Sequence, residues 1–279
     1  MKILSRSGLP VIILLACGAV FSQETLDSRI RSEVTRFKGK VSLYAKNLDS
    51  GQTYSLNGDE RVRTASTIKI AVMIEAFARV AEGRAKWTDE LVLTKAARYG
   101  GSGILPELSD GLRLTLQDCL RLMMLLSDNT ATNMVLDYLT TDAVNERMNS
   151  LGFKATRIMR RVGGGGESKE GKLGDNLKRF GLGATTPHEM VQIMEELDRG
   201  EIVNKDASKQ MIELMKREQA RYSIGRSMPN GRWRASTARS MRCAVASQFS
   251  TRSRARSPWR LQSMRCLRWF GRSTTPDIC

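Results

Sequence analysis

A serine and a lysine three residues apart, Ser66 and Lys69, stand at the start of an apolar segment and have the chemistry of a catalytic pair. Residues at positions i and i+3 share a helix face, so the Ser66 hydroxyl is expected beside the Lys69 amine. The positive end of the helix and burial both lower the pKa of such an amine and make its neutral form accessible. A neutral lysine can accept the proton of a serine that attacks a carbonyl. The pair therefore predicts a nucleophilic serine with a lysine base, although the same two residues can simply begin a helix.

The chain has one histidine, His188, which limits the possibilities for a histidine base and for a zinc site. It falls in the first turn of a later predicted helix, where it is an ordinary helix-start residue. A Ser-His-Asp triad would have to use His188, so Lys69 is the more economical base for Ser66. Catalytic zinc sites use several histidines or a cysteine cluster, which this composition does not favour. We therefore expect no metal and no cofactor.

A second polar group, Ser127-Asp128-Asn129, lies between two strongly apolar helical segments, residues 114–126 and 130–139. A short turn held between buried helices is a rigid place to mount a hydroxyl and an amide. Ser127 is suited to pass a proton to a leaving nitrogen, and Asn129 to orient a substrate amide. The alternative is that one of the three residues only caps the helix that follows, and both roles are compatible.

The elements around these motifs are predicted as strands first and helices afterwards, which indicates an α+β fold. Residues 41–45 and 53–56 are rich in strand formers, and the turn residues 49–51 between them predict a hairpin. From residue 66 onward, apolar residues recur at three- and four-residue steps and predict a buried helix that ends at Gly83. Further helices are predicted at 114–126, 130–139, 144–151 and from 186, and a long loop at 163–183.

Ser-x-x-Lys followed 61 residues later by Ser-Asp-Asn resembles the class A β-lactamases and the wider penicillin-recognising serine hydrolases. The resemblance covers about residues 25–225 and includes the order of elements and the Thr-Thr-Pro helix start at 185–187. It implies a β-lactamase/transpeptidase-like fold. In that fold an antiparallel sheet is flanked by helices, and an all-helical lobe completes the site.

The resemblance also implies a role for each motif residue. Ser66 would be the acylated nucleophile, Lys69 its activating base and Ser127 the proton shuttle, while Asn129 would contact the substrate side-chain amide. The Ser66 backbone N–H would form half of an oxyanion hole. The implied reaction is acyl transfer from a β-lactam to Ser66, followed by hydrolysis. The same fold suits a slow penicillin-binding protein or a D-alanyl-D-alanine peptidase acting on a peptidoglycan-like peptide. A non-catalytic binding module is the alternative from another class.

The sequence departs from that family at the deacylating glutamate. Class A enzymes carry it in a Glu-x-x-Leu-Asn setting before the Thr-Thr-Pro turn, and that string does not occur here. Glu167 is the residue that we assign to this catalytic role, with Glu170 as the alternative. Both can equally be solvated residues of a glycine-rich loop. Without a placed base, water would attack the acyl-enzyme slowly, as in a penicillin-binding protein.

Residues 231–279 differ in composition from the rest of the chain. They hold 11 Arg, no Lys and one acidic residue, so +10 of the net charge of +16 lies there. The family's Lys-Thr/Ser-Gly strand is expected after about residue 230, but no lysine follows Lys216. A basic arm for nucleic acid does not suit an exported protein, and three Trp and two Phe argue against disorder. With permissive codon choices, an offset reading of codons 234–239 can spell Ser-Lys-His-Gly, which is compatible with the missing strand. We interpret this tail as an out-of-frame translation that leaves the C-terminal strands missing or scrambled, after a two-lobed catalytic domain at 23–230.

The N-terminal residues predict export. Two basic residues precede an uncharged stretch at 7–23, which is typical of a secretory signal peptide, here residues 1–22. These 17 uncharged residues fall short of the roughly 20 that span a bilayer, and a lipid anchor at Cys17 is a weaker alternative. We therefore expect a periplasmic or secreted monomer that meets a small-molecule β-lactam, with no nucleic-acid partner and no membrane span after cleavage.

Overall fold

The computed structural model describes residues 25–218 and 243–250. The chain divides into two units, residues 1–38 and 39–279. In the first, α1 (Leu26–Thr35) begins after Thr25, whose side chain accepts a hydrogen bond from the Ser28 N–H. The predicted signal peptide, residues 1–22, lies outside the described residues, as does most of the predicted out-of-frame tail.

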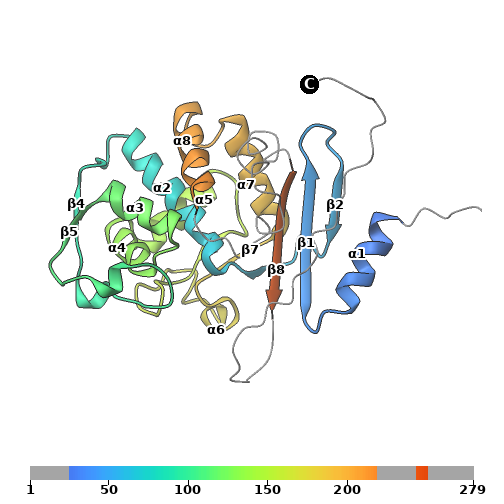
Figure 1. Ribbon diagram of the computed structural model, residues 1–279, viewed down its shortest axis with the longest axis horizontal. Helices are drawn as coiled ribbons and strands as arrows, with labels where there is room; N and C mark the ends of the chain where they lie inside the picture. The colour runs from blue at the N-terminus through green and yellow to red at the C-terminus, as the bar shows by residue number, and fades with distance from the viewer. Residues whose placement is uncertain (1–24, 219–242, 251–279) are drawn as a thin grey trace, which may run out of the picture. The chain divides into compact units, whose positions relative to one another are not determined.

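The second unit contains a three-stranded antiparallel sheet with the strand order β2-β1-β8 (Figure 1). β1 (Lys40–Asn47) and β2 (Thr53–Leu56) form the predicted hairpin. On its other side β1 pairs with β8 (Cys243–Ser250) along its whole length. Helix α7 (Pro187–Arg199) lies against β1 and β8. One segment of the predicted tail therefore forms a strand of this sheet.

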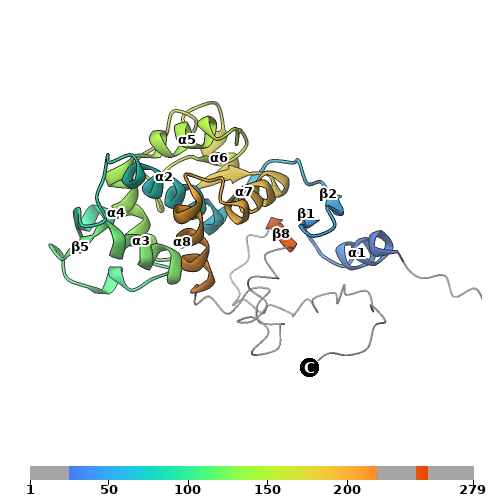
Figure 2. The ribbon, with the colours of Figure 1, turned by 90° about the horizontal axis from the view of Figure 1, so that it is seen from above.

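Helix α2 (Lys69–Ala81) is the central helix of the second unit, as its apolar sequence predicts. Met73 and Ile74 are completely buried, and even Glu75 is only 2% exposed. Figure 2 shows the helices that surround it. Those that contact α2 are α3 (Leu116–Leu125), α4 (Asn129–Leu139), α5 (Thr141–Ser150) and α8 (Lys205–Lys216). The first three correspond to helices predicted from hydrophobic periodicity.

Three element boundaries differ from the predictions. The predicted helix from residue 66 begins as a 3₁₀ turn, Ala65–Ile68, before the α-helix proper. The start of the predicted helix 114–126 is instead strand β5 (Arg113–Thr115), which pairs with β4 (Glu90–Val92). α5 begins three residues earlier than predicted, because the Thr140 hydroxyl caps it.

A second small sheet connects the long loop to the segment that leads into Ser66. Its strands are β3 (Val62–Arg63), β7 (Gly183–Thr185) and β6 (Arg157–Ile158), with β7 in the middle. The loop between β6 and β7 contains the short helix α6 (Asn176–Phe180). Just beyond β3, the Thr64 N–H donates to the Gly183 carbonyl at 3.0 Å. Both ends of the long loop are therefore fixed beside the start of the 3₁₀ turn.

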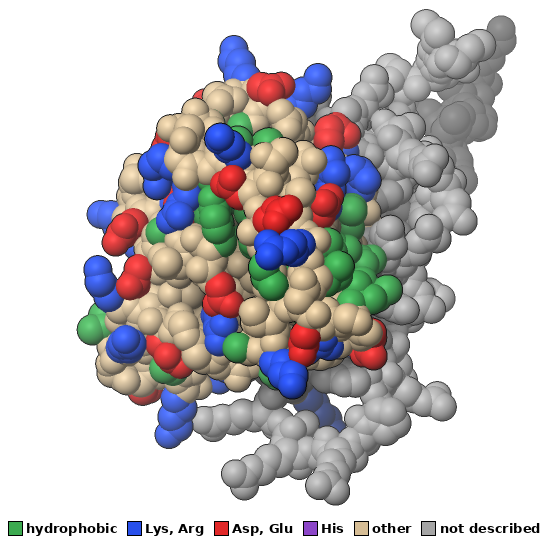
Figure 3. Space-filling model, turned by 90° about the vertical axis from the view of Figure 1, so that its left-hand side faces the viewer, with side chains coloured by type: hydrophobic (Ala, Val, Ile, Leu, Met, Phe, Trp, Pro, Cys, Tyr) green, Lys and Arg blue, Asp and Glu red, His purple; other side chains and the backbone are tan. Residues whose placement is uncertain are grey.

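None of the helices that the structure describes is long and apolar enough to cross a bilayer. On the face drawn in Figure 3, acidic and basic side chains are interspersed rather than gathered by sign. That face therefore offers no continuous basic surface of the kind that binds nucleic acid.

Candidate active site

Ser66 and Lys69 come together at the start of α2, but with different exposure. Ser66 lies in the exposed part of the 3₁₀ turn, whereas Lys69 is only 2% exposed. Ala65, just before the serine, has a φ of +44°, a conformation that costs energy for any residue with a Cβ. The turn therefore presents the serine hydroxyl to solvent and keeps the amine in the protein interior.

Ser127 lies between the other two groups. Its Oγ is 3.1 Å from Ser66 Oγ and 2.9 Å from Lys69 Nζ. Ser127 itself has a φ of +53° in the tight turn between α3 and α4. A left-handed conformation at a serine is uncommon and marks a turn that the surroundings hold in place. The result is a continuous run of three polar atoms from the exposed hydroxyl to the buried amine.

The Lys69 amine has two further partners that can only accept hydrogen bonds. These are the Ser127 carbonyl oxygen at 2.7 Å and Asn129 Oδ1 at 3.1 Å. The orientation of the Asn129 amide is set because its Nδ2 donates to the Gly100 carbonyl at 2.9 Å. A protonated amine donates to all three partners. A neutral amine donates to the two obligate acceptors and accepts the Ser127 proton on its lone pair.

Burial lowers the pKa of Lys69 to about 8, and the negative charges of Asp128 and Glu218 oppose that shift. An exposed lysine has a pKa of about 10.4 and is almost entirely charged near neutral pH. The shift makes the neutral amine a substantial species just above neutrality. With the amine neutral, the proton of Ser66 can move to Ser127 while the proton of Ser127 moves to Lys69.

Asp128 holds the Ser127 turn in place, a role that sequence reasoning assigned only in part. Its side chain caps α4 by accepting from the Ala131 N–H at 2.8 Å, as the capping alternative predicted. The same fully buried carboxylate also accepts from the N–H groups of Ile104 and Leu105, at 2.7 and 2.9 Å. A Cβ on Gly103 would collide with that carboxylate. The glycine itself was the signal in the sequence that could have pointed to this contact. Gly103 has a φ of +100°, a conformation that favours glycine.

Asn133 is a second residue that the sequence analysis did not identify. Its amide exchanges two hydrogen bonds with the backbone of Val162, at 2.9 and 3.1 Å, and donates to the Ala97 carbonyl. It is 2% exposed and lies four residues after Asn129, hence on the same face of α4. This spacing was the available signal. Asn133 fixes the loop after β6 to the helix that carries Asn129.

The two candidate deacylating glutamates have partners in their own loop and, for Glu170, in the segment just before β3. Glu167 accepts a hydrogen bond from the Gly165 N–H at 3.1 Å. Glu170 pairs with Arg61 at 3.4 Å and accepts from Asn176 Nδ2. Within residues 25–218, no hydrogen bond joins either carboxylate to Ser66, Ser127 or Lys69. Hydrogen bonds therefore link four of the five predicted residues into one group, namely Ser66, Lys69, Ser127 and Asn129. Glu167 is bonded within its own loop, and its catalytic role stays a prediction.

His188 contacts Asp59 and Tyr44, outside the group formed by Ser66, Ser127 and Lys69. Its Nδ1 lies 2.7 Å from Asp59 Oδ1, and its ring stacks on Tyr44 with the ring centres 4.1 Å apart. These contacts fasten the start of α7 to the turn before β3. Among the described residues, no three His, Cys, Asp or Glu side chains are grouped to hold a metal ion.

Comparisons with known proteins identify the family of this chain. Residues 25–246 match the model of the β-lactamase enzyme family. The β-lactamase CARB-4 of Pseudomonas aeruginosa is 26% identical over 227 residues, which cover 79% of this chain and 76% of the relative.

Two solved structures are similar in fold and sequence. A β-lactamase from Sphaerobacter thermophilus DSM 20745 has a TM-score of 0.62 and 33% identity, covering 72% of this chain and 71% of that one. PBP-A has a TM-score of 0.63 and 25% identity, covering 73% and 72%. A variant of PBP-A was solved as an acyl-enzyme complex with penicillin G.

These matches confirm the resemblance seen in the two sequence motifs and the fold that it implied. Because the family match covers well over half of its length, the chain belongs to the β-lactamase enzyme family and is a serine hydrolase of the class A-like type.

Proposed function

We propose that a β-lactam acylates Ser66 and that the proton of Ser66 leaves through Ser127 to the neutral amine of Lys69. One observation carries this proposal: the run of polar atoms from Ser66 Oγ to Ser127 Oγ to Lys69 Nζ, with separations of 3.1 and 2.9 Å. Both distances lie within reach of a single proton transfer. The exposure of Ser66 supports its role as the atom that meets the substrate.

In the acylation step, Ser66 Oγ forms a bond to the lactam carbonyl carbon. The proton of Ser66 passes to Ser127 Oγ as the proton of Ser127 passes to Lys69 Nζ. The tetrahedral intermediate then breaks its bond to the lactam nitrogen. That nitrogen takes a proton from Ser127, which the Lys69 ammonium replaces, so the amine returns to its neutral form. The Ser66 N–H, at the start of a helix, is suited to stabilise the oxyanion.

Asn129 is proposed to bind the amide of the substrate side chain. Its Oδ1 already accepts from Lys69, and one Nδ2 hydrogen is used by the Gly100 carbonyl. An asparagine amide has two N–H donors, so one remains for a substrate carbonyl. Asn129 would thereby contact the substrate while holding the amine in position.

Slow turnover is the second candidate, and the placement of the two glutamates favours it. Glu167 accepts a hydrogen bond from Gly165, and Glu170 is engaged by Arg61 and Asn176. If no base is positioned to activate the hydrolytic water, the acyl-enzyme is long-lived. The protein would then hydrolyse β-lactams at a rate limited by deacylation, and a peptidoglycan-like peptide is the alternative substrate.

The test is a rapid-mixing experiment with benzylpenicillin and the full chain. We expect a burst of ring opening equal to the enzyme concentration, followed by a slow steady rate. Equal burst and steady rates would contradict slow deacylation. Absence of any ring opening by folded protein would contradict the proposal as a whole. The Ser66→Ala variant, which keeps Ser127 and Lys69, is the matched control and is expected to show neither phase.

We also propose that the chain acts outside the cytoplasm. The charge pattern of residues 1–22 supports this assignment. Sequencing the N-terminus of protein recovered from a periplasmic fraction is expected to give Gln23 first. A mature chain that retains Met1 would contradict it.

A further inference from the structure

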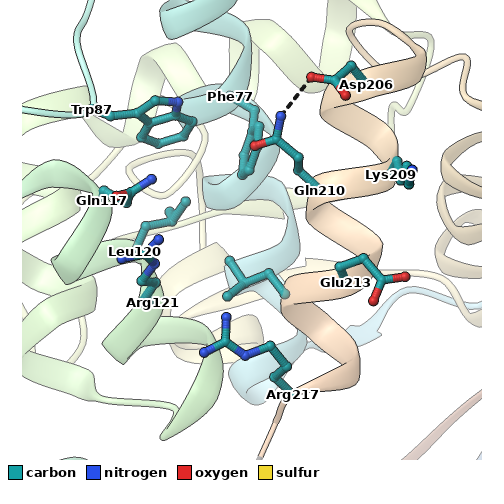
Figure 4. A pocket seen from close by; sticks show the side chains of 11 residues that line it. Phe77, Trp87, Gln117, Leu120, Arg121, Asp206, Lys209, Gln210, Glu213 and Arg217 are labelled. Carbon is teal, nitrogen blue, oxygen red and sulfur yellow. Dashed lines mark hydrogen bonds between the residues drawn. The ribbon is translucent and has the colours of Figure 1, made fainter. Parts of the chain in front are cut away.

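A groove separate from Ser66 opens between α3, α8 and the C-terminal half of α2 (Figure 4). Its volume is about 360 Å³. Protein cavities that bind small molecules have volumes of roughly 300–1,000 Å³. The groove is therefore large enough for a compact ligand of one or two rings.

One end of the groove is apolar and aromatic. Phe77 and Trp87 meet edge to face, with their ring centres 4.8 Å apart. Leu120 and Leu214 line the same groove and are 2% and 8% exposed. Such a surface favours a flat apolar body, because aromatic rings gain from edge and stacking contacts as well as from burial.

The other end of the groove is cationic. Figure 4 shows the guanidinium groups of Arg121, from α3, and Arg217, just after α8, at the same end of the groove. Arg121 has one carboxylate nearby, Asp118, at 3.6 Å, and both side chains are nearly half exposed. Within the described ranges, no ion pair involves Arg217. Two guanidinium groups that lie close together and have one nearby carboxylate among the described residues attract an anion.

The acidic side chains of the groove are directed to other partners. Asp206 accepts a hydrogen bond from Gln210 Nε2 at 2.8 Å, and Glu213 pairs with Lys216 at 2.7 Å. In Figure 4 the Glu213 carboxylate points away from the two arginines. Among the described residues, neither of these carboxylates pairs with the two arginines.

We propose that this groove is a second binding site, for a small amphipathic anion whose aromatic body packs on Phe77 and Trp87 and whose sulfonate or carboxylate lies between Arg121 and Arg217. The groove is separate from the acylation site, because none of its lining residues belongs to the Ser66–Ser127–Lys69 group.

The test measures binding of 2-naphthalenesulfonate to the full chain by equilibrium dialysis at low ionic strength. The variants are Arg121→Gln and Arg217→Gln, and Arg179→Gln is the control, because Arg179 is an exposed arginine on the distant α6. Each groove variant is expected to weaken binding about tenfold, the usual value of one hydrogen bond to a charged group. The control should bind like the parent chain, and the arginines of 231–279 are identical in all four proteins.

A second probe separates the charge from the aromatic contact. The neutral 2-naphthalenesulfonamide should bind the parent chain and the two groove variants equally, because it lacks the charge that the arginines recognise. The Phe77→Leu variant should weaken both probes. Binding of the sulfonate that is unaffected by either arginine variant would overturn the proposal, as would an equal loss in the Arg179→Gln control. Unchanged melting temperatures of the arginine variants show that a loss of binding is not a loss of folding.

Discussion

At the scale of single residues, the partners of Lys69 explain how a buried lysine can serve as a base. Two of them, a carbonyl and an amide oxygen, accept hydrogen bonds in every state. The third, the Ser127 hydroxyl, can accept from an ammonium or donate to an amine. The Lys69 amine therefore keeps these three hydrogen-bond partners when its proton arrives or leaves. The site stabilises both protonation states that acylation requires.

The pKa of Lys69 predicts the pH dependence of acylation. With a pKa lowered to about 8, the neutral amine is a minor species below that pH and dominant above it. The acylation rate should fall about tenfold for each pH unit below 8 and level off above it. Single-turnover kinetics with benzylpenicillin between pH 6 and about 9.5 measure this profile. A rate that is flat across pH 8 would contradict Lys69 as the base.

Removal of the Ser127 hydroxyl should interrupt proton transfer without disturbing the fold. In Ser127→Ala, Ser66 Oγ loses the only hydroxyl that links it to Lys69 in the part of the chain that the structure describes. We expect the acylation rate to fall roughly a hundredfold or more. Ser150→Ala, which removes an exposed hydroxyl on α5, is the control. Equal acylation rates in the two variants would show that Ser127 carries no proton.

The spacing of residues predicted these groups because they belong to local motifs. Ser66 and Lys69 are three residues apart on one turn, and Ser127 to Asn129 form one tight turn, so each motif is visible in a short window. The distance of 2.9 Å between Lys69 Nζ and Ser127 Oγ joins the two motifs and depends on tertiary packing. The expected position of Glu167 could not be read from the sequence, because a run of four glycines sets no direction for the side chain that follows.

At the scale of elements, the 99–105 loop and the turn between α3 and α4 form one hydrogen-bonded assembly. The Asn129 N–H donates to the Ser102 carbonyl, and the Ser102 hydroxyl donates to the Leu126 carbonyl. Asp128 adds its two bonds to the backbone of Ile104 and Leu105. The loop therefore supports the strained conformation of Ser127.

Gly103→Ala should break this assembly. A Cβ there would meet the Asp128 carboxylate and backbone, in addition to the cost of a positive φ. Gly111→Ala is the matched control, since Gly111 also has a positive φ but an added Cβ would find open space. We expect about 1 kcal/mol of destabilisation in the control and at least ~2 kcal/mol more in Gly103→Ala.

Urea unfolding of both variants measures this difference, and acylation kinetics should show a large loss only for Gly103→Ala. Equal stabilities would mean that the loop does not bear on the Ser127 turn.

Among the elements, the long periodic helices and the β1–β2 hairpin were predictable, whereas the strands of two or three residues were not. The pattern in α2, α3 and α4 repeats over ten or more residues, which is enough to show which face is buried. β3 and β6 have two residues each and exist because β7 lies between them. No local pattern specifies such a pairing, because the partner is far away in sequence.

At the scale of the whole molecule, the chain joins a family-like body to a tail of different composition. The family match ends at residue 246, inside β8. A tail segment pairs with β1 in the main sheet. An antiparallel partner satisfies the backbone of β1 with little demand on the side chains, so a sequence of altered composition can occupy that position.

We propose that the reading frame changes near Met228, and this proposal makes a prediction about the gene sequence. Sequencing the gene around that codon is expected to reveal a position at which one inserted or deleted base restores a Lys-Thr/Ser-Gly-type motif. The restored chain should unfold at a higher temperature, because its C-terminal residues would again match the sheet that they enter. A gene with no such alternative frame would contradict the proposal.

The central claim is that Ser66 forms an acyl-enzyme with a β-lactam. Intact-mass spectrometry of the purified chain mixed with benzylpenicillin tests it most directly, with peptide mapping to locate the adduct. We expect one added penicillin per chain, on the peptide that contains Ser66, and this adduct should clear slowly as hydrolysed drug accumulates. Its absence from Ser66→Ala is part of that prediction. A folded chain that gains no mass, or an adduct that persists in Ser66→Ala, would rule out Ser66 as the acylated nucleophile.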